Sequence, residues 1–361
     1  MLLVCFQSCT SSNNCNTSAT KSDTIKIDEI KLCKLEPEHF KTRWIPSLIL
    51  KEKNNPRFPI KLIETHGKLF FSYVSNSSYL ILASLLDSNE IYRIPISYYT
   101  SMSHHFLMDI IKDTIHLLDV KQKEYYQIEL KDNFSLGNKK TFNLNNIGID
   151  NDIYILTKTS GTQLNFIFPN LLIPYGKTQN KNYLDDRGLL KIDLSTNQFS
   201  KVIEFPEWYQ SCNIYSERIN FDLKDNYIYA TFTNSGKIIK LNLDNNKIQF
   251  NSIPGSSSFR PFKKELEKNL AYVRQYEETI EKNSELLTLS GGGYVIVKKL
   301  PRESISEKIK VRVYLFDKEN KIQCYNLFEG ESIPFILKKY QSGFVILDVT
   351  LSNLLYYEVS N

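Results

Sequence analysis

The sequence has no apolar run long enough to cross a membrane as a helix, which would need about 18 or more residues. It also lacks any concentration of charge of one sign. Its 45 Lys and Arg residues are interspersed with 40 Asp and Glu residues, so the net charge is only +5 over 361 residues. Proteins that bind nucleic acid usually carry a basic patch or stripe. We therefore expect neither a membrane-spanning helix nor a nucleic-acid partner.

The motifs that mark common enzyme and cofactor sites are missing as well. There is no GxSxG elbow, no Walker phosphate loop, no GxGxxG and no HExxH. The glycine cluster at 290–294, SGGGY, precedes an apolar run rather than a helix, so it is predicted to be a turn. The histidine pair, His104 and His105, would point to opposite faces of a strand and could not share a metal. We expect no cofactor, no metal and no catalytic residues.

Cysteine is too sparse to build the fold. Three of the six cysteines fall within the first 15 residues, and the other three are far apart. This spacing gives neither a disulfide framework nor a CxxC metal pair. Isolated cysteines in strand-like surroundings are usually small buried hydrophobes, and this is the expectation for Cys33, Cys212 and Cys324.

The N-terminus, MLLVCFQSCTSSNNCNTSATKSD, resembles the end of a bacterial lipoprotein signal. A short apolar run is followed by Ser8 and then Cys9, the best candidate for lipidation. Residues 10–22 would be a flexible tether, so residues 1–22 form one segment and 23–361 the folded domain. The run is short and no basic residue precedes it, unlike a complete signal peptide. The alternative is a polar tail with incidental cysteines. A lipid anchor in the cell envelope would be the only membrane attachment.

Aromatic residues are abundant, and the chain repeats itself. Phe, Trp and Tyr make up 12% of the residues, which favours strands. Residues 188–205, GLLKIDLSTNQFSKVIEF, match residues 236–253, GKIIKLNLDNNKIQFNSI, in pattern. Each has an alternating apolar strand, a polar turn and a second alternating strand, which predicts a β-hairpin. Weaker copies occur at 79–96, 114–130 and 310–328, most of them preceded by one or two further apolar runs.

A unit of three or four antiparallel strands cannot bury both its faces alone, whereas stacked copies can. A period of about 40–50 residues is typical of β-propellers. We predict an all-β, six-bladed β-propeller, with seven blades as the alternative count. The units lie near 58–96, 98–130, 142–205, 212–253, 284–328 and 333–360. The last unit has three strands, so the N-terminal strand 23–35 is predicted to pair with it and close the ring.

Two insertions interrupt the repeats. Residues 261–287 are predicted to be a helix, with serines 256–258 available as caps. Phe262, Leu266, Leu270, Val273 and Ile280 would lie near one face of it. Glu277, Glu278 and Glu281 would lie on the solvated face. The helix would cover a sheet edge or the pore mouth, or serve as a lid or docking element. Residues 170–188 are predicted to be a long polar loop.

The candidate ligand-binding residues lie in two loops. Tyr183, Asp185, Asp186 and Arg187 combine an aromatic ring, carboxylates and a guanidinium, which could hold a sugar or a peptide. An ordinary Asx turn explains the same residues. Trp208 and Tyr209 follow a strand and form either an exposed binding surface or packing between blades.

The lipobox-like FQSC, the polar tether and repeats such as GLLKIDLSTNQ and GKIIKLNLDNNK resemble the uncharacterised six-bladed β-propeller lipoproteins of Bacteroidetes. That resemblance implies a cell-envelope location and supplies no catalytic residues. We expect a non-enzymatic binding or scaffold protein for a glycan, a peptide or an envelope protein. The alternatives are a propeller hydrolase or lyase acting on a glycan or small ester, with acidic residues at the channel mouth, and a structural assembly component. The sequence does not predict an oligomeric state.

Overall fold

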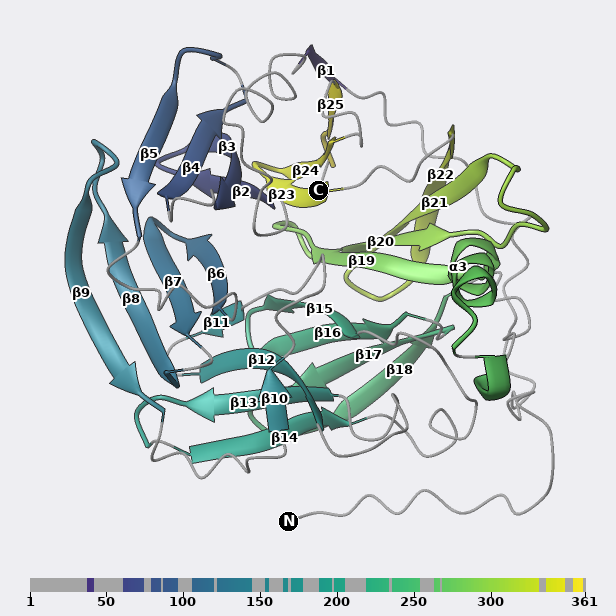
Figure 1. The fold of residues 1–361 in the computed structure, drawn as a ribbon, viewed down its shortest axis with the longest axis horizontal. Helices are drawn as coiled ribbons and strands as arrows, with labels where there is room; N and C mark the ends of the chain where they lie inside the picture. The colour runs from purple at the N-terminus through teal and green to yellow at the C-terminus, as the bar shows by residue number, and fades with distance from the viewer. Residues whose placement is uncertain are drawn as a thin grey trace.

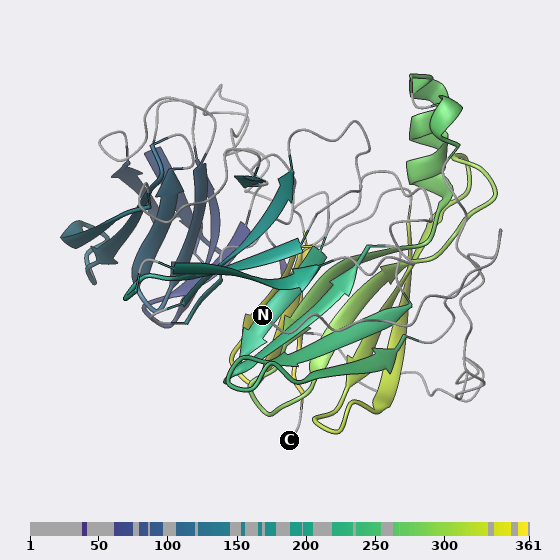
Figure 2. The ribbon, with the colours of Figure 1, turned by 90° about the horizontal axis from the view of Figure 1, so that it is seen from below.

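The computed structural model is a six-bladed β-propeller, as the repeats predict (Figure 1). Six antiparallel sheets stand around a central axis, and Figure 2 shows the same ring from below. The structure describes residues 38–41, 61–74, 79–85, 87–96, 106–119, 122–144, 153–155, 165–167, 170–177, 188–196, 198–204, 219–233, 236–253, 263–266, 268–330, 336–347 and 353–359.

Blades one to three follow one another along the chain. Blade one contains β2 (Lys61–Thr65), β3 (Lys68–Val74), β4 (Tyr79–Ser84) and β5 (Ile91–Pro95). Blade two contains β6 (Phe106–Ile111), β7 (Thr114–Asp119), β8 (Glu124–Leu130) and β9 (Leu136–Asn143). Blade three contains β10 (Ile153–Ile155), β11 (Asn165–Ile167), β12 (Asn170–Lys177), β13 (Gly188–Asp193) and β14 (Gln198–Glu204).

Blades four to six complete the ring. Blade four contains β15 (Ile219–Lys224), β16 (Tyr227–Phe232), β17 (Lys237–Asn242) and β18 (Ile248–Ser252). Blade five contains β19 (Lys282–Thr288), β20 (Tyr294–Lys299), β21 (Ile309–Phe316) and β22 (Ile322–Gly330). Blade six contains β23 (Ile336–Tyr340), β24 (Gly343–Leu347), β25 (Asn353–Tyr357) and, from the other end of the chain, β1 (Glu38–Lys41).

The hydrophobic core is divided among the contacts between blades. Six clusters of buried apolar side chains each combine residues of two neighbouring blades, and one of them joins blade six to blade one. Successive side chains of a strand point to opposite faces. On β3, for example, Phe70 packs toward blade two and Phe71 packs toward blade six. This is why the strands are apolar at consecutive positions: a blade buries both faces.

The ring closes through an N-terminal strand, but not through the segment expected. β1 pairs antiparallel with β25, and His39 lies opposite Leu355. Residues 23–35, predicted for this role, lie outside the described residues. β1 is only four residues long and shows little alternation, so its sequence gave no strand signal of its own.

One predicted blade boundary and one predicted loop were wrong. The fourth strand of blade two is β9, LGNKKTFN, which is polar because it is the outermost strand and mostly exposed. Residues 170–177, predicted as part of a loop, form β12 and pair with β13 despite containing Pro174. The SGGGY stretch is a turn, as predicted, with Gly292 and Gly293 at φ 99° and 79°.

The inserted helix is shorter than predicted. α3 spans Leu270–Thr279 and follows a 3-10 turn at Lys264–Leu266, while residues 282–288 belong to β19. Asn269 caps α3, rather than serines 256–258, by accepting a hydrogen bond from the Tyr272 N–H. Its buried residues are Val273, Tyr276 and Thr279, whereas Leu270 is 81% exposed. In Figure 2 the helix stands out from one face of the ring.

Two of the glutamates predicted to lie on a solvated face, Glu278 and Glu281, form ion pairs. Glu281 pairs with Lys298, whose side chain is 1% exposed, and Glu278 pairs with Arg302 at 2.6 Å. Burial lowers the pKa of Lys298, and Glu281 partly opposes this shift. The Lys299 ammonium and the Arg302 guanidinium also donate to backbone carbonyls at the end of α3. Cations interact favourably with the C-terminal end of a helix dipole, and these two side chains also fix α3 to blade five.

The first hairpin turns of blades one, two, four, five and six, which the structure describes, lie together on one face, which we call the turn face. It comprises the turns at His66–Gly67, Lys112–Asp113, Asp225–Asn226, Ser290–Gly293 and Gln341–Ser342. Hydrogen bonds join neighbouring turns: Lys224 Nζ donates to Leu289 O at 2.6 Å, and Ser290 Oγ donates to Gln341 O at 3.1 Å. α3 precedes β19 and so lies at the opposite end of that strand.

Cys324, on β22, is disulfide-bonded, so the expectation of a buried free thiol was wrong for this residue. The other five cysteines lie outside the described residues. Within the part of the chain that the structure describes, no helix is both long and apolar enough to cross a membrane.

Asp222 on β15 gives a test of the contact between blades four and five. Its Oδ2 accepts hydrogen bonds from the Thr288 N–H and hydroxyl at 2.7 and 2.8 Å. Burial raises the pKa of Asp222, and these bonds only partly oppose the shift. A raised folded-state pKa means that stability falls as pH rises from the ordinary value through the raised one.

We therefore expect Asp222→Asn to retain or gain stability at pH 7, by up to about 1 kcal/mol, and to lose this advantage near pH 3. Asp222→Ala, which leaves the Thr288 N–H without its acceptor, is the matched destabilising variant. Urea unfolding at the two pH values measures the difference. The quantity compared is the difference in unfolding free energy between Asp222→Asn and the wild type. If this difference is markedly less favourable to the variant at pH 7 than at pH 3, the account is contradicted.

Candidate functional site

The site residues predicted from sequence are not among those that the structure describes. This holds for Cys9, for Tyr183, Asp185, Asp186 and Arg187, and for Trp208 and Tyr209. It also holds for the pair His104 and His105. These assignments therefore remain predictions.

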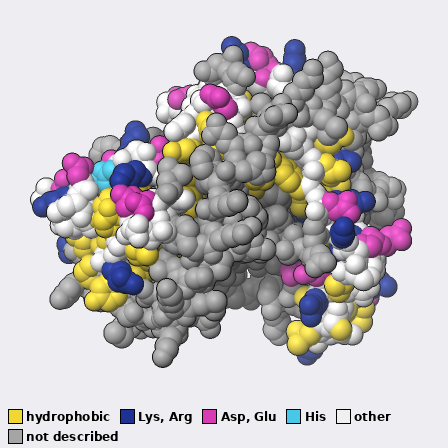
Figure 3. Space-filling model, turned by 90° about the horizontal axis from the view of Figure 1, so that it is seen from above, with side chains coloured by type: hydrophobic (Ala, Val, Ile, Leu, Met, Phe, Trp, Pro, Cys, Tyr) yellow, Lys and Arg dark blue, Asp and Glu magenta, His cyan; other side chains and the backbone are white. Residues whose placement is uncertain are grey.

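The described residues form a different candidate site, a cleft of about 640 Å³ at the seam between blades one and two. Volumes of roughly 300–1,000 Å³ are typical of small-ligand sites. His66 comes from blade one, and blade two supplies the other lining residues: Lys112, Asp113, Thr114, Glu129, Leu130, Lys131, Asp132 and Asn133. Figure 3 shows the ring from its edge, with basic and acidic side chains around a histidine.

Three tight turns build the cleft. His66 and Gly67 join β2 to β3 with φ of 48° and 67°, and Lys112 and Asp113 join β6 to β7 with φ of 48° and 57°. Positive φ at both central residues matches the twist of a two-residue hairpin, so the backbone of both turns is well defined. The third turn joins β8 to β9 and places Phe134 at φ 59°.

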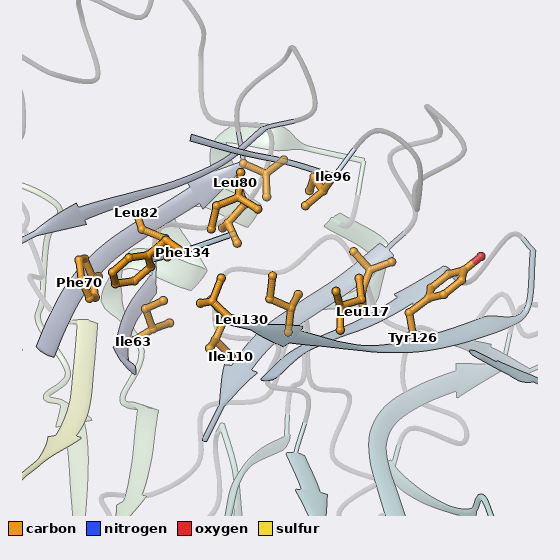
Figure 4. Packing of buried hydrophobic residues seen from close by; sticks show 14 residues of the cluster. Ile63, Phe70, Leu80, Leu82, Ile96, Ile110, Leu117, Tyr126, Leu130 and Phe134 are labelled. Carbon is orange, nitrogen blue, oxygen red and sulfur yellow. The ribbon is translucent and has the colours of Figure 1, made fainter. Parts of the chain in front are cut away.

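Phe134 supports the cleft from below. Its ring stacks on Tyr92 with centroids 3.8 Å apart, and the His66 imidazole meets it edge-on at 5.3 Å. Phe134 and Leu130 belong to the apolar cluster between blades one and two (Figure 4). The polar turns are therefore held on a packed apolar floor.

Asp113 joins the two blades across the cleft. Its Oδ1 accepts hydrogen bonds from the Thr65 hydroxyl and the His66 N–H, both at 2.6 Å. The His66 imidazole lies between carboxylates, with Nδ1 3.1 Å from Asp132 Oδ1 and 3.7 Å from Asp113 Oδ1. Burial by itself raises the pKa of Asp113, but the hydrogen bonds from Thr65 and His66 outweigh it and the pKa is lowered. Asp113 is thus held as a carboxylate.

No group of three or more metal-ligating side chains is found among the described residues. The buried histidine on β7, His116, has a structural role. Its Nδ1 is 2.6 Å from the Tyr125 hydroxyl, and burial lowers its pKa to about 4.

The cleft was not predicted from the sequence, because its residues come from three turns that are far apart in the chain. THGK at 65–68, KDT at 112–114 and KDNF at 131–134 are each ordinary turn sequences of Asp, Asn and Gly. Nothing local shows that the ring brings them together. In a propeller the first turns of adjacent blades share a face, and this rule would have placed the first two of these turns side by side.

Comparison with known proteins supports the fold but identifies no family for this chain. No family model matches the chain, and no curated protein matches it. A member of the DUF4221 family from Bacteroides vulgatus is similar in structure, with a TM-score of 0.60, 11% identity, and coverage of 92% of this chain and 98% of that one. This likeness supports the propeller architecture.

Two more distant structures are also similar over most of their length. An exported-protein candidate from Bacteroides fragilis has a TM-score of 0.48 at 11% identity, covering 92% of this chain and 98% of that one. A luciferin-regenerating enzyme has a TM-score of 0.43 at 8% identity, covering 90% and 96%. Neither likeness is close enough to inform function.

The hydrogen bonds to Asp113 predict a pH-dependent stability. A lowered folded-state pKa contributes stability above the ordinary carboxyl pKa, and this contribution is lost as pH falls through the folded value. Asp113 is 45% exposed, so solvent screens much of the effect. We expect Asp113→Asn to lose about 0.5–1 kcal/mol at pH 7 and almost nothing near pH 2.

Chemical unfolding at both pH values measures this loss. Asp87→Asn, on the β4–β5 turn of blade one, is a control, because the Asp87 side chain accepts only the local N–H of Asn89, at 2.9 Å, among the contacts described. Equal losses for Asp113→Asn at both pH values would refute the interpretation.

Proposed function

We propose that this chain is a cell-envelope β-propeller with a non-enzymatic binding or scaffold function. Its ligand would be a glycan, a peptide or a protein of the envelope, held on the turn face. The observation that supports this proposal is the cleft between blades one and two. Its lining is polar, it is built by three tight turns, and it rests on a packed aromatic floor. Such preorganisation lowers the entropic cost of binding.

The alternative of a hydrolase or lyase has less support at this site. Glycoside hydrolysis needs one carboxyl group that stays protonated to act as an acid. The pKa of Asp113 is shifted in the opposite direction, and its Oδ1 is already engaged by two donors. Asp113 is thus better suited to accept a hydrogen bond from a ligand than to donate a proton.

Two features support an envelope location. The N-terminal FQSC offers Cys9 as a lipidation site, followed by a polar tether. Cys324 is disulfide-bonded, and disulfides persist mainly in oxidising compartments such as the periplasm or the cell surface. Lipid anchoring would hold the propeller at the membrane.

Filling the cleft tests the binding site without assuming the chemistry of the ligand. Thr114→Trp places an indole in the cleft, and Lys321→Trp places one on the exposed β21–β22 turn of blade five. The full chain and both variants are screened against envelope polysaccharides and a peptide library. We expect Thr114→Trp to abolish binding, a loss of about 100-fold or more, and Lys321→Trp to retain it. Binding that survives in Thr114→Trp would exclude the cleft.

The anchor has its own test. Expression of Cys9→Ser in a bacterium that lipidates its envelope proteins should release the chain from the membrane fraction, because a lipid is the only attachment proposed. Cys15→Ser is the matched control and should remain membrane-bound. Metabolic labelling with a fatty acid gives a direct readout. Labelling of Cys9→Ser would contradict the assignment.

A further inference from the structure

The side chains that line the cleft between blades one and two indicate which class of ligand it can bind, provided that the proposed binding function holds. Its charges nearly balance. Two lysines, Lys112 and Lys131, face three carboxylates, Asp113, Glu129 and Asp132. The His66 imidazole lies against Asp132, with Nδ1 3.1 Å from its Oδ1. A strongly anionic or cationic ligand would meet side chains of its own sign in this lining.

The three carboxylates share one arrangement. Each has an oxygen engaged by the protein: Oδ1 of Asp113 by Thr65 and His66, Oε2 of Glu129 by the N–H and amide of Asn138, and Oδ1 of Asp132 by His66. Among the contacts described for these residues, the second oxygen of each carboxylate accepts no hydrogen bond. The engaged oxygen orients the carboxylate, and the second one is left as an acceptor for a ligand.

Donors lie beside these acceptors. Lys112, Lys131 and Asn133 can each donate to a ligand, and the Thr114 hydroxyl can donate or accept. A hydroxyl group donates one hydrogen bond and accepts others at the same time, so neighbouring hydroxyls match alternating acceptors and donors. A neutral polyhydroxylated ligand satisfies the whole lining without a net charge of its own.

The cleft fits a peptide less well. Peptides are usually bound by pairing with an open strand edge or by apolar pockets for their side chains. Hairpin turns, not a strand edge, form this cleft, and Leu130 is the one apolar residue among the described residues that line it. Phe134 is 7% exposed and lies beneath the surface, so it offers no groove for an apolar side chain.

We propose that this cleft binds a short segment of neutral carbohydrate. Hydroxyl groups of the sugar donate to the second oxygens of Asp113, Glu129 and Asp132 and accept from Lys131 and Asn133. The contact is made by hydrogen bonds rather than by stacking on an aromatic face.

The test uses the full chain and calorimetry with four probes: mannotriose and cellotriose as neutral sugars, a galacturonate trisaccharide as an acidic one, and a polar decapeptide. Asp132→Asn removes a charged acceptor from a fully exposed side chain and leaves the core intact. Glu319→Gln makes the same change on the equivalent turn of blade five, away from the cleft. We expect a neutral trisaccharide to bind, with a loss of about tenfold in Asp132→Asn and no change in Glu319→Gln.

Salt gives a second readout. Binding of a neutral sugar should be unchanged between about 50 and 500 mM NaCl, whereas binding of a charged ligand weakens as salt screens it. Binding of only the acidic sugar or the peptide, changed in Asp132→Asn, would overturn the assignment of a neutral carbohydrate but keep the cleft as a binding site. Binding that Asp132→Asn and Thr114→Trp both leave intact would overturn the cleft itself.

Discussion

The structure depends on the contact between the faces of neighbouring blades. Each of the six sheets is apolar on both sides, and each of the six large clusters joins two sheets. An open row of blades would leave two apolar faces in water. The cluster that joins blade six to blade one removes them, and it includes Tyr356 and Val345 of blade six with Phe71 of blade one. β1 completes that blade by covering the outer edge of β25, which would otherwise be open to pairing with another chain.

Ring closure also creates the candidate site. Because the first strands of adjacent blades run in the same direction, their turns share a face, and turns far apart in the sequence come together. Thr65 and Asp113 are 48 residues apart and are joined by a hydrogen bond. The cleft lies above the apolar cluster that holds blades one and two together, so its floor is as rigid as the core. α3 lies at the other end of β19, fixed by Lys298, Lys299 and Arg302, and leaves the turn face uncovered.

The sequence predicted most of the fold and little of the site. Hairpins with alternating apolar residues, such as 236–253, predicted the blades, because a period of two residues distinguishes the two faces of a sheet. β1 and β9 were missed because β1 is only four residues long and β9 is polar and mostly exposed, so neither carries that pattern. The helix was extended into β19, and the pairing of Glu281 with Lys298 was missed, because a glutamate near a helix gives no sign of a buried partner on another strand. The disulfide at Cys324 and the cleft depend on contacts between distant residues, which local patterns do not contain.

The most direct test of this account is to remove β1 and measure the stability and the self-association of the propeller. A chain beginning at residue 42 is compared with one beginning at residue 38, which keeps β1, by thermal unfolding and by sedimentation over a range of concentrations. Closure through β1 predicts that the shorter chain unfolds about 5 °C or more lower and self-associates as concentration rises, because the edge of β25 is exposed. Equal unfolding temperatures, with both chains monomeric, would contradict the claim that the two ends of the chain hold the propeller closed.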